Sequence, residues 1–163
     1  MSKISVLMSV YKKENPEYLR ASLESILVQT RTADEILLIE DGPLTQELYQ
    51  VVAEYQKKCD YLHVHAMEQN VQLGRALAKG VELCQYDLIA RMDTDDIAMP
   101  HRLEKEGAYM EAHPEVDVVG GAIREFNDEG TIDRVKNMPK TQEEILEYVK
   151  VRNPLNHMTV MYL

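Results

Sequence analysis

The sequence has few cysteines and no long apolar run. Only two cysteines occur among the 163 residues, Cys59 and Cys84, and they form no CxxC pair. Without a disulfide framework, we expect a reducing compartment and two thiols that act as small, partly buried apolar side chains. No stretch approaches the roughly 20 apolar residues of a membrane span, and no signal-peptide pattern opens the chain. We therefore expect a cytoplasmic protein. Any attachment to the inner face of a membrane would need a region outside this chain.

Positive charge is also scarce. The 28 Asp and Glu residues outnumber the 18 Lys and Arg residues, which gives a formal net charge of −10, and no basic stripe or run occurs. Because nucleic-acid affinity rests largely on cations that neutralise phosphates, we expect no nucleic-acid partner. An anionic substrate would need a metal ion or a few well-placed cations to bind to this chain.

A glycine-rich phosphate loop is missing as well. Neither GxGxxG nor GxxxxGK[ST] follows the first apolar segment, where dinucleotide-binding and P-loop folds carry it. The stretch SVYKKENP stands there instead. The same absence counts against a sugar-activating nucleotidyltransferase, although that function stays open as an alternative.

Short apolar segments alternate with amphipathic segments along the chain. Five segments are predicted to form strands: KISVLMSV, DEILLIEDG, YLHVHA, YDLIARM and EVDVVGGAIREF. Between them, apolar residues recur at helical spacing over residues 16–30, 44–55 and 73–84, and again in a helix that Pro100 is expected to open. This alternation predicts an α/β fold with a mostly parallel sheet flanked by helices, in one domain over residues 1–163.

The last quarter of the sequence has a weaker pattern. Thr141 and Glu144 form a capping-box pair at the start of a short helix. The Gly120-Gly121 pair is expected to mark a bulge or a close approach of two backbones. The final residues, HMTVMYL, have the composition of a strand. Because the chain stops inside that expected strand, we expect a domain that is incomplete at its C-terminus.

Three polar turns, YKKEN, EDG and DTDD, follow predicted strands. The carboxyl ends of parallel strands share one edge of a sheet, where ligands of open α/β sheets bind. The last turn holds Asp93, Asp95 and Asp96, and carboxylates this close repel one another unless a cation lies among them. Mg²⁺ and Mn²⁺ prefer such oxygen ligands and often share them with substrate phosphates. Asp93 and Asp95 therefore predict a divalent metal site, although a solvated polar turn would have the same composition.

Four spaced segments together resemble the family 2 glycosyltransferases, which have the GT-A fold, a Rossmann-like α/β architecture. SVLMSVYKKENPEYLRASLESILVQT is similar to the family's first strand and helix, and EILLIEDG to its strand that ends in Asp-Asp-Gly. NVQLGRALAKGVE resembles its Asn-x-Gly-Leu helix opening, and YDLIARMDTDD followed by MPHRLEKE resembles its DxD segment. The resemblance covers nearly the whole chain. It implies the N-terminal, donor-binding portion of an inverting enzyme that transfers a sugar from a nucleotide diphosphate to an acceptor hydroxyl.

The resemblance also implies residues of a nucleotide site. The backbone around Val10 and Tyr11 would line the base pocket, and Asp41 would accept a hydrogen bond from the base. Arg75 would face the diphosphate, unless it is only a surface arginine of its helix. Glu40 departs from the family pattern, because the family usually has Asp at this position.

The DxD segment carries the remaining implied roles. Asp93 and Thr94 would lie near the ribose and the diphosphate, and Asp95 would be the direct ligand of Mn²⁺ or Mg²⁺, with Asp93 beside it. The family's general base belongs to a later acidic motif, which is expected after Leu163, so the donor half would be present without that base. His157, in the segment that leads toward the motif, is a weaker candidate for the same task.

The implied partners are a nucleotide-diphosphate sugar, with a UDP-sugar as the default, and a glycan or lipid-linked acceptor in polysaccharide or surface-glycan synthesis. A homo-oligomer is conceivable if a sheet edge is exposed. A noncatalytic module that binds nucleotide sugars stays open as a second alternative function.

Overall fold

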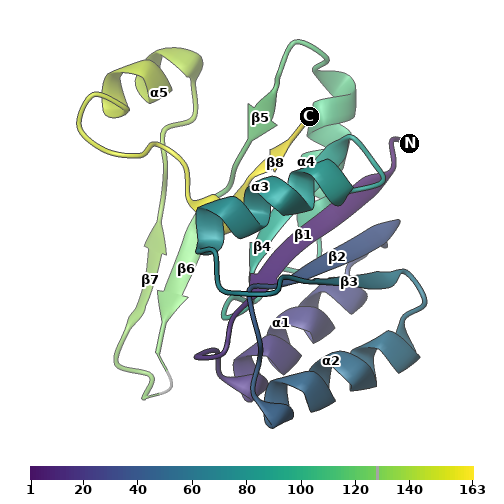
Figure 1. Ribbon diagram of the computed structural model, residues 1–163. Coiled ribbons are helices and arrows are strands. Elements are labelled where there is room, and N and C mark those ends of the chain that lie inside the picture. Colours follow the sequence, from purple (N-terminus) through teal and green to yellow (C-terminus); the bar gives the residue numbers. More distant parts are fainter. Residues whose placement is uncertain (128) are drawn as a thin grey trace.

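The computed structural model describes residues 1–127 and 129–163. Its main sheet has six strands in the order β3-β2-β1-β4-β8-β5, and the β6–β7 hairpin stands beside it (Figure 1). The strands are β1 Ile4–Val10, β2 Glu35–Glu40, β3 Leu62–Ala66, β4 Leu88–Asp93, β5 Val118–Val119, β6 Ile123–Phe126, β7 Asp133–Lys136 and β8 Met161–Tyr162. The helices are α1 Pro16–Leu27, α2 Gln46–Lys58, α3 Leu73–Leu83, α4 Arg102–Ala112, α5 Gln142–Tyr148 and the 3₁₀-helix η1 His157–Thr159.

The centre of the main sheet is parallel, as the alternating pattern predicted. β1 pairs in parallel with both β2 and β4, and β2 pairs in parallel with β3. β8 then pairs antiparallel with β4 and with β5. The carboxyl ends of β1, β2 and β4 therefore share one edge, and the three polar turns predicted from the sequence meet there.

The apolar strands are buried on both faces. Met8 of β1 and Leu38 of β2 belong to a cluster that also contains residues of α1, α2 and α4. Their chain neighbours Leu7 and Ile39 belong to a second cluster, which is closed by Ala76 of α3. Figure 1 shows α1 and α2 on one side of the sheet and α3 on the other. Helices on both faces explain why these strands are nearly continuous apolar runs rather than alternating ones.

The helix starts follow local capping rules. Asn15 precedes Pro16, and its Oδ1 accepts a hydrogen bond of 2.8 Å from the backbone N–H of Glu17. At α5, the capping box between Thr141 and Glu144 is present in both directions, which confirms that prediction.

The expected start of the fourth helix at Pro100 was wrong by two residues, because α4 begins at Arg102. The reason is a tertiary clamp from the end of α1. The Gln29 side chain donates from Nε2 to the carbonyl of Met99 at 2.9 Å, and its Oε1 accepts from the N–H of Leu103 at 3.1 Å. The clamp holds residues 99–101 as a turn and satisfies a free amide in the first turn of the helix.

The expected fifth strand, EVDVVGGAIREF, is divided between two sheets. β5 belongs to the main sheet, whereas β6 pairs only with β7 in the hairpin. Gly120-Gly121 separates them, and the N–H of Gly121 donates to Thr159 Oγ1 at 2.9 Å. Asn156 Nδ2 donates to the carbonyl of Gly121 at 3.1 Å. The expected close approach is therefore present, but the polar bonds to η1 end the strand there.

Two further parts of the C-terminal quarter differ from expectation. HMTVMYL begins as the 3₁₀-helix η1, and only Met161–Tyr162 forms a strand. The hairpin strand β7 was not predicted, because its sequence DRVK is polar and mostly exposed and so lacks an alternating apolar pattern.

The burial of the two thiols and the character of the helices are as the sequence led us to expect. Cys59 is buried and Cys84 is partly buried, and neither forms a disulfide. Within residues 1–127 and 129–163, no helix combines the length and the apolar character needed to cross a membrane.

Candidate functional site

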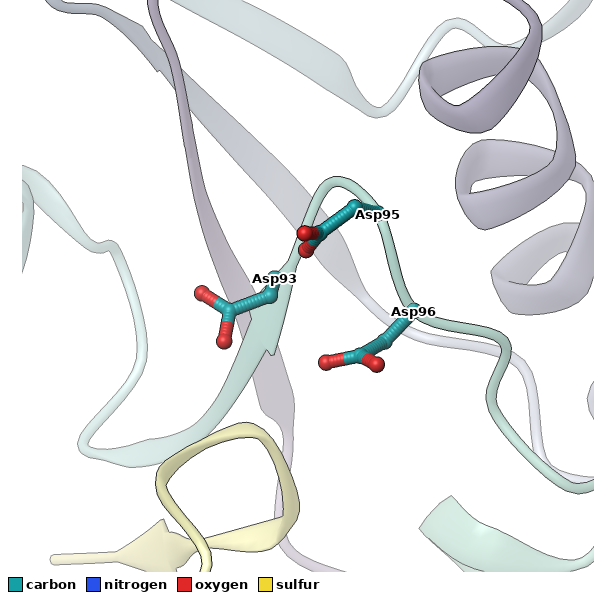
Figure 2. A group of neighbouring side chains, drawn as sticks. All are labelled: Asp93, Asp95 and Asp96. Carbon is teal, nitrogen blue, oxygen red and sulfur yellow. The ribbon is translucent and has the colours of Figure 1, made fainter. Parts of the chain in front are cut away.

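The aspartate turn lies directly at the end of β4. Asp93 is the last residue of the strand, and Asp95 and Asp96 follow in the turn (Figure 2). One carboxylate oxygen from each of the three lies within 4.8 Å of the others. The turn is fastened to α1, because Ser22 Oγ donates to the carbonyl of Asp93 at 2.8 Å. Three carboxylates thus gather at the edge where the sequence predicted a metal site.

Arg91 holds one of the three carboxylates. Its guanidinium is buried and contacts both oxygens of Asp93, with Nη1 2.6 Å from Oδ2 and Nη2 against Oδ1. Burial raises the pKa of Asp93, and the Arg91 charge works in the opposite direction. In the part of the chain that the structure describes, Asp95 and Asp96 form no hydrogen bond or ion pair. Their oxygens are therefore available to a cation.

Asp96 is the member of the cluster to which the sequence assigned no role. Burial raises its pKa to about 6, and the charges of Asp95 and Asp93 add to the rise. Removal of a carboxylate from water beside two like charges is unfavourable unless a cation neutralises it. An all-carboxylate donor set of this kind fits hard divalent cations such as Mg²⁺ and Mn²⁺.

Thr94 joins the aspartate turn to the turn after β1. Its side chain is buried, and its Oγ1 donates to Glu14 Oε2 at 2.7 Å, with the carbonyl of Ser9 at 3.4 Å. Glu14 was not singled out from the sequence, although it lies in the polar turn YKKEN. Because Thr94 is held from both sides, its backbone has a fixed position beside the three aspartates.

Asp41 is buried at the end of β2 and organises the segment that leads into α3. Its Oδ2 accepts from Asn70 Nδ2 at 2.9 Å, and its Oδ1 accepts from the N–H of Val71 at 2.6 Å. The next residue, Gly42, has a φ of 82°, and a Cβ built on it would lie 2.5 Å from the backbone nitrogen of Asn70. This close approach requires a glycine, which explains why the EDG turn ends in one.

The other residues of the expected nucleotide site lie on the same edge. The N–H of Asp41 donates to the carbonyl of Val10 at 2.8 Å, so these two residues are direct neighbours. Tyr11 is exposed just beyond them. Arg75 is exposed in the first turn of α3, and its guanidinium forms no hydrogen bond or ion pair among the described residues. Burial raises the pKa of Glu40.

A cavity of about 850 Å³ opens beside the aspartate turn, toward α4 and the β6–β7 hairpin. It lies between that turn, α4, η1 and the β6–β7 hairpin, and Asp96 forms part of its wall. Apolar side chains such as Ile97, Phe126 and Met158 face it together with Glu106 of α4. The polar edge is thus continuous with a large, mixed cavity.

Comparison with known proteins agrees with this arrangement. Residues 5–162 match the family described as Glycosyl transferase family 2. The chain belongs to this family. A Haemophilus influenzae glycosyltransferase of uncharacterised specificity is 47% identical over 98% of this chain and 60% of its own length. The amylovoran biosynthesis glycosyltransferase AmsE of Erwinia amylovora is 44% identical over 97% of this chain and 59% of its own length. The family 2 chain thus spans about three fifths of the length of these relatives.

The fold is shared with a solved structure. The structure of S. aureus TarS 1-349 in complex with UDP-GlcNAc aligns with a TM-score of 0.74 and 20% identity. The alignment covers 98% of this chain and 45% of that one. At this identity the likeness concerns the fold, and it confirms the GT-A type architecture that the sequence predicted.

Two basic residues of the family 2 chain brace the site from the side of α4. Arg102 Nε donates to the carboxylate of Glu106 at 3.1 Å, and its Nη2 donates to the carbonyls of Arg91 at 2.8 Å and Val160 at 3.3 Å. His101 lies 3.0 Å from Glu104 through Nδ1. Arg102 thereby joins the first turn of α4 to β4 and to the residue before β8.

His157 lies in η1, which packs against β4. Its Nε2 is 2.6 Å from Asn153 Nδ2, the amide of which donates to the ring. This bond orients the imidazole and occupies the nitrogen that a general base would use.

Proposed function

We propose that this chain is the donor-binding part of a glycosyltransferase that acts in polysaccharide or surface-glycan synthesis. It would support transfer of a sugar from a nucleotide diphosphate to an acceptor hydroxyl, with inversion and with the help of Mn²⁺ or Mg²⁺. The observation that carries this proposal is the meeting of Asp41, Thr94 and the aspartate turn on one sheet edge of a family 2 chain. The name of the amylovoran relative and the UDP-GlcNAc in the TarS structure support a glycan product and a nucleotide-sugar donor.

The base would bind over the ends of β1 and β2. The backbone at Val10 and Tyr11 would form one wall, and Asp41 would accept a hydrogen bond from an N–H of the base. A carboxylate has about four lone-pair positions. Asn70 and Val71 each donate one hydrogen bond to Asp41, so lone pairs remain for the base. Because Asp41 is already held in place, it would lose little side-chain freedom on binding. A uridine nucleotide is the proposed donor.

The diphosphate would bind at the end of β4. Asp95 would hold the metal directly, with Asp93 beside it and Asp96 as a further carboxylate. When bound, the metal would neutralise the diphosphate and stabilise the charge of the leaving group. Arg91 keeps the Asp93 carboxylate in one orientation, and Arg75 would be an exposed cation for the diphosphate in the first turn of α3.

The acceptor hydroxyl would attack the anomeric carbon from the face opposite the diphosphate, and a carboxylate would remove its proton as general base. His157 is poorly suited to this task because Asn153 donates to its Nε2. We propose that the base lies outside residues 1–163, in a region corresponding to the additional length of the relatives.

Calorimetric titration with UDP, GDP and dTDP, with and without Mn²⁺, tests the donor site. One nucleotide should bind with Mn²⁺ and at least tenfold more weakly without it. Asp95→Ala should abolish this dependence on the metal. Asp60→Ala is the matched control, because Asp60 is an exposed aspartate just before β3, at the amino end of that strand and away from the site. This variant should bind the nucleotide like the unchanged chain.

Two results would contradict the assignment. If Asp95→Ala bound the nucleotide with unchanged dependence on Mn²⁺, Asp95 would not be the metal ligand. If no nucleotide bound under either condition, the donor-binding role itself would fail.

A further inference from the structure

We propose that Glu14 is a positioning residue for the divalent cation, which acts by holding Thr94 and so fixes the direction of the aspartate turn. This role rests on the proposed function, because it takes Asp93 and Asp95 as carboxylates that hold Mn²⁺ or Mg²⁺. Glu14 lies outside the group of three aspartates that gather at the end of β4. It acts through Thr94 and not by contact with the metal.

Thr94 stands between the two proposed metal ligands. Its side chain is buried, whereas Asp93 is partly exposed and Asp95 is fully on the surface. Side chains of neighbouring residues at the end of a strand point to opposite sides. In Figure 2 the Asp95 side chain extends from the turn toward the side on which Asp93 lies. An inward Thr94 therefore directs both of its neighbours to the face where a cation would bind.

The inward side chain of Thr94 is held by a carboxylate. Thr94 Oγ1 lies 2.7 Å from Glu14 Oε2 and 3.4 Å from the carbonyl oxygen of Ser9. A hydroxyl has one hydrogen to donate, so the short, charge-assisted bond to Glu14 is the stronger of the two contacts. Without Glu14 the hydroxyl would keep only the distant carbonyl, and the turn between Asp93 and Asp95 would be less firmly oriented.

Glu14 is itself fixed by its neighbours. Its Oε1 accepts from the N–H of Asn15 at 2.8 Å, and its own N–H donates to the carbonyl of Tyr11 at 3.0 Å. Tyr11 belongs to the proposed wall of the base pocket, and Thr94 belongs to the aspartate turn. Glu14 thus bonds to both of the turns on which the nucleotide and the metal would bind.

The negative charge of Glu14 favours the same role. It brings a further carboxylate to a turn that already carries Asp93, Asp95 and Asp96. Carboxylates gathered at one turn repel one another, and a bound cation reverses the sign of that effect. A further acid is therefore unfavourable for the metal-free turn and favourable for the metal-bound one. Partners that orient metal ligands from outside the coordination shell change metal affinity by about 10–100-fold.

The start of α1 does not account for this carboxylate. Asn15 is the N-cap residue of the helix, and its Oδ1 accepts from the N–H of Glu17 at 2.8 Å. Pro16 has no N–H to satisfy. The helix therefore has its own cap and does not need the oxygen that Glu14 directs to Thr94.

Titration of the chain with Mn²⁺, followed by the electron paramagnetic resonance signal of the free ion, tests this role. Glu14→Ala should weaken Mn²⁺ binding about tenfold. Glu14→Gln should weaken it by no more than about threefold, because it loses the charge but either end of its amide can bond to the Thr94 hydroxyl. Glu17→Ala is the matched control, since Glu17 is an exposed glutamate of the same turn of chain, 3.9 Å from Arg20, and this variant should bind Mn²⁺ like the unchanged chain.

A double-mutant cycle with Thr94→Val tests whether Glu14 acts through Thr94. Each single variant should weaken Mn²⁺ binding. The double variant should bind no more weakly than Glu14→Ala alone, because both substitutions remove the same hydrogen bond. Urea unfolding on the same samples shows that each variant is folded and separates a loss of stability from a loss of metal affinity.

The positioning role is overturned if Glu14→Ala binds Mn²⁺ like the unchanged chain, whatever its stability, since Glu14 would then be structural only. It is also overturned if Glu14→Gln binds as weakly as Glu14→Ala, or if the losses in the cycle are additive. These results would leave the proposed function intact. If the unchanged chain and Asp95→Ala bind Mn²⁺ equally, the metal assignment itself fails, and the role of Glu14 fails with it.

Discussion

Arg91 and Asp93, two residues apart on β4, form a partly buried ion pair in which the guanidinium contacts both carboxylate oxygens, with Nη1 2.6 Å from Oδ2. The pair divides the aspartate cluster into one anchored carboxylate and two that are unpaired among the described residues, Asp95 and Asp96. An anchored Asp93 keeps a negative charge at a fixed place, while its neighbours can adjust to a cation. The pair therefore serves both the stability of β4 and the geometry of the site.

Replacement of Arg91 by Met should destabilise the chain by about 1–3 kcal/mol, because removal of the buried partner leaves the partly buried Asp93 carboxylate uncompensated. Urea unfolding monitored by circular dichroism measures the change. The double variant Arg91→Met with Asp93→Asn should recover much of the loss. Arg75→Met, at an exposed arginine, should unfold like the unchanged chain. An Arg91→Met chain of undiminished stability would show that the pair contributes nothing net.

Gly42→Ala should destabilise the chain by about 1–3 kcal/mol, because φ is 82° and the new Cβ would meet the backbone of Asn70 at 2.5 Å. The displaced segment also carries the partners of Asp41, so nucleotide affinity should fall. Gly74→Ala is the matched control. It lies in the first turn of α3 with nothing within 4 Å of the added Cβ, and it should be neutral or slightly stabilising. Equal effects of the two substitutions would contradict the steric argument.

Stability should depend on the ionisation of Glu106. Burial raises the pKa of this carboxyl to about 7 from an ordinary value of 4.5, so the folded chain holds the proton more tightly than the unfolded chain. Its contribution to stability is therefore present below about pH 4.5 and is lost as the pH rises to about 7. Glu106→Gln cannot titrate.

Urea unfolding of both chains without metal, at several pH values from 4.5 to 8, measures this effect. The stability of the unchanged chain relative to Glu106→Gln should fall by on the order of 2–3 kcal/mol across this range. Glu104→Gln, an exposed neighbour on α4, should not reproduce that fall, since the pKa of Glu104 is lowered by hydrogen bonds from Thr30 and His101. A constant difference between the unchanged chain and Glu106→Gln would show that Glu106 is already ionised at pH 4.5.

The central fold was predictable because its signals are local. Apolar runs such as ISVLMSV and EILLIE are too short to be buried helices and so favour buried strands, and each is followed by an amphipathic helix. The hairpin β6–β7 and the short strands β5 and β8 carry no comparable signal. Their residues are polar, half-exposed or interrupted by Gly120-Gly121, and their pairing depends on contacts with distant parts of the chain.

The residue types of the site were predictable from the sequence, but the contacts between their side chains were less so. The aspartate turn was recognised from residue type and spacing and Asp41 from the family resemblance, and both lie on the predicted edge. Neither Glu14 as the partner of Thr94 nor Asn70 as the partner of Asp41 was found, because these bonds join segments that are 29 or more positions apart. In the sequence, Glu14 is only a polar residue in a turn, and Asn70 opens the segment NVQLGRALAKGVE, which names no partner for it.

By itself, the sequence determined the alternation of strands and helices, the family resemblance and the place where negative charge accumulates. The alternation and the charged turn follow from periodicity, turn chemistry and charge repulsion, which act between residues close along the chain, and the resemblance rests on four spaced motifs. The tertiary structure alone decided that Asp93 is anchored while the side chains of Asp95 and Asp96 have no partner in residues 1–127 and 129–163, and that Glu106 and Phe126 share one cavity. Those facts depend on which side chains leave water together, and burial is a property of the packed chain as a whole.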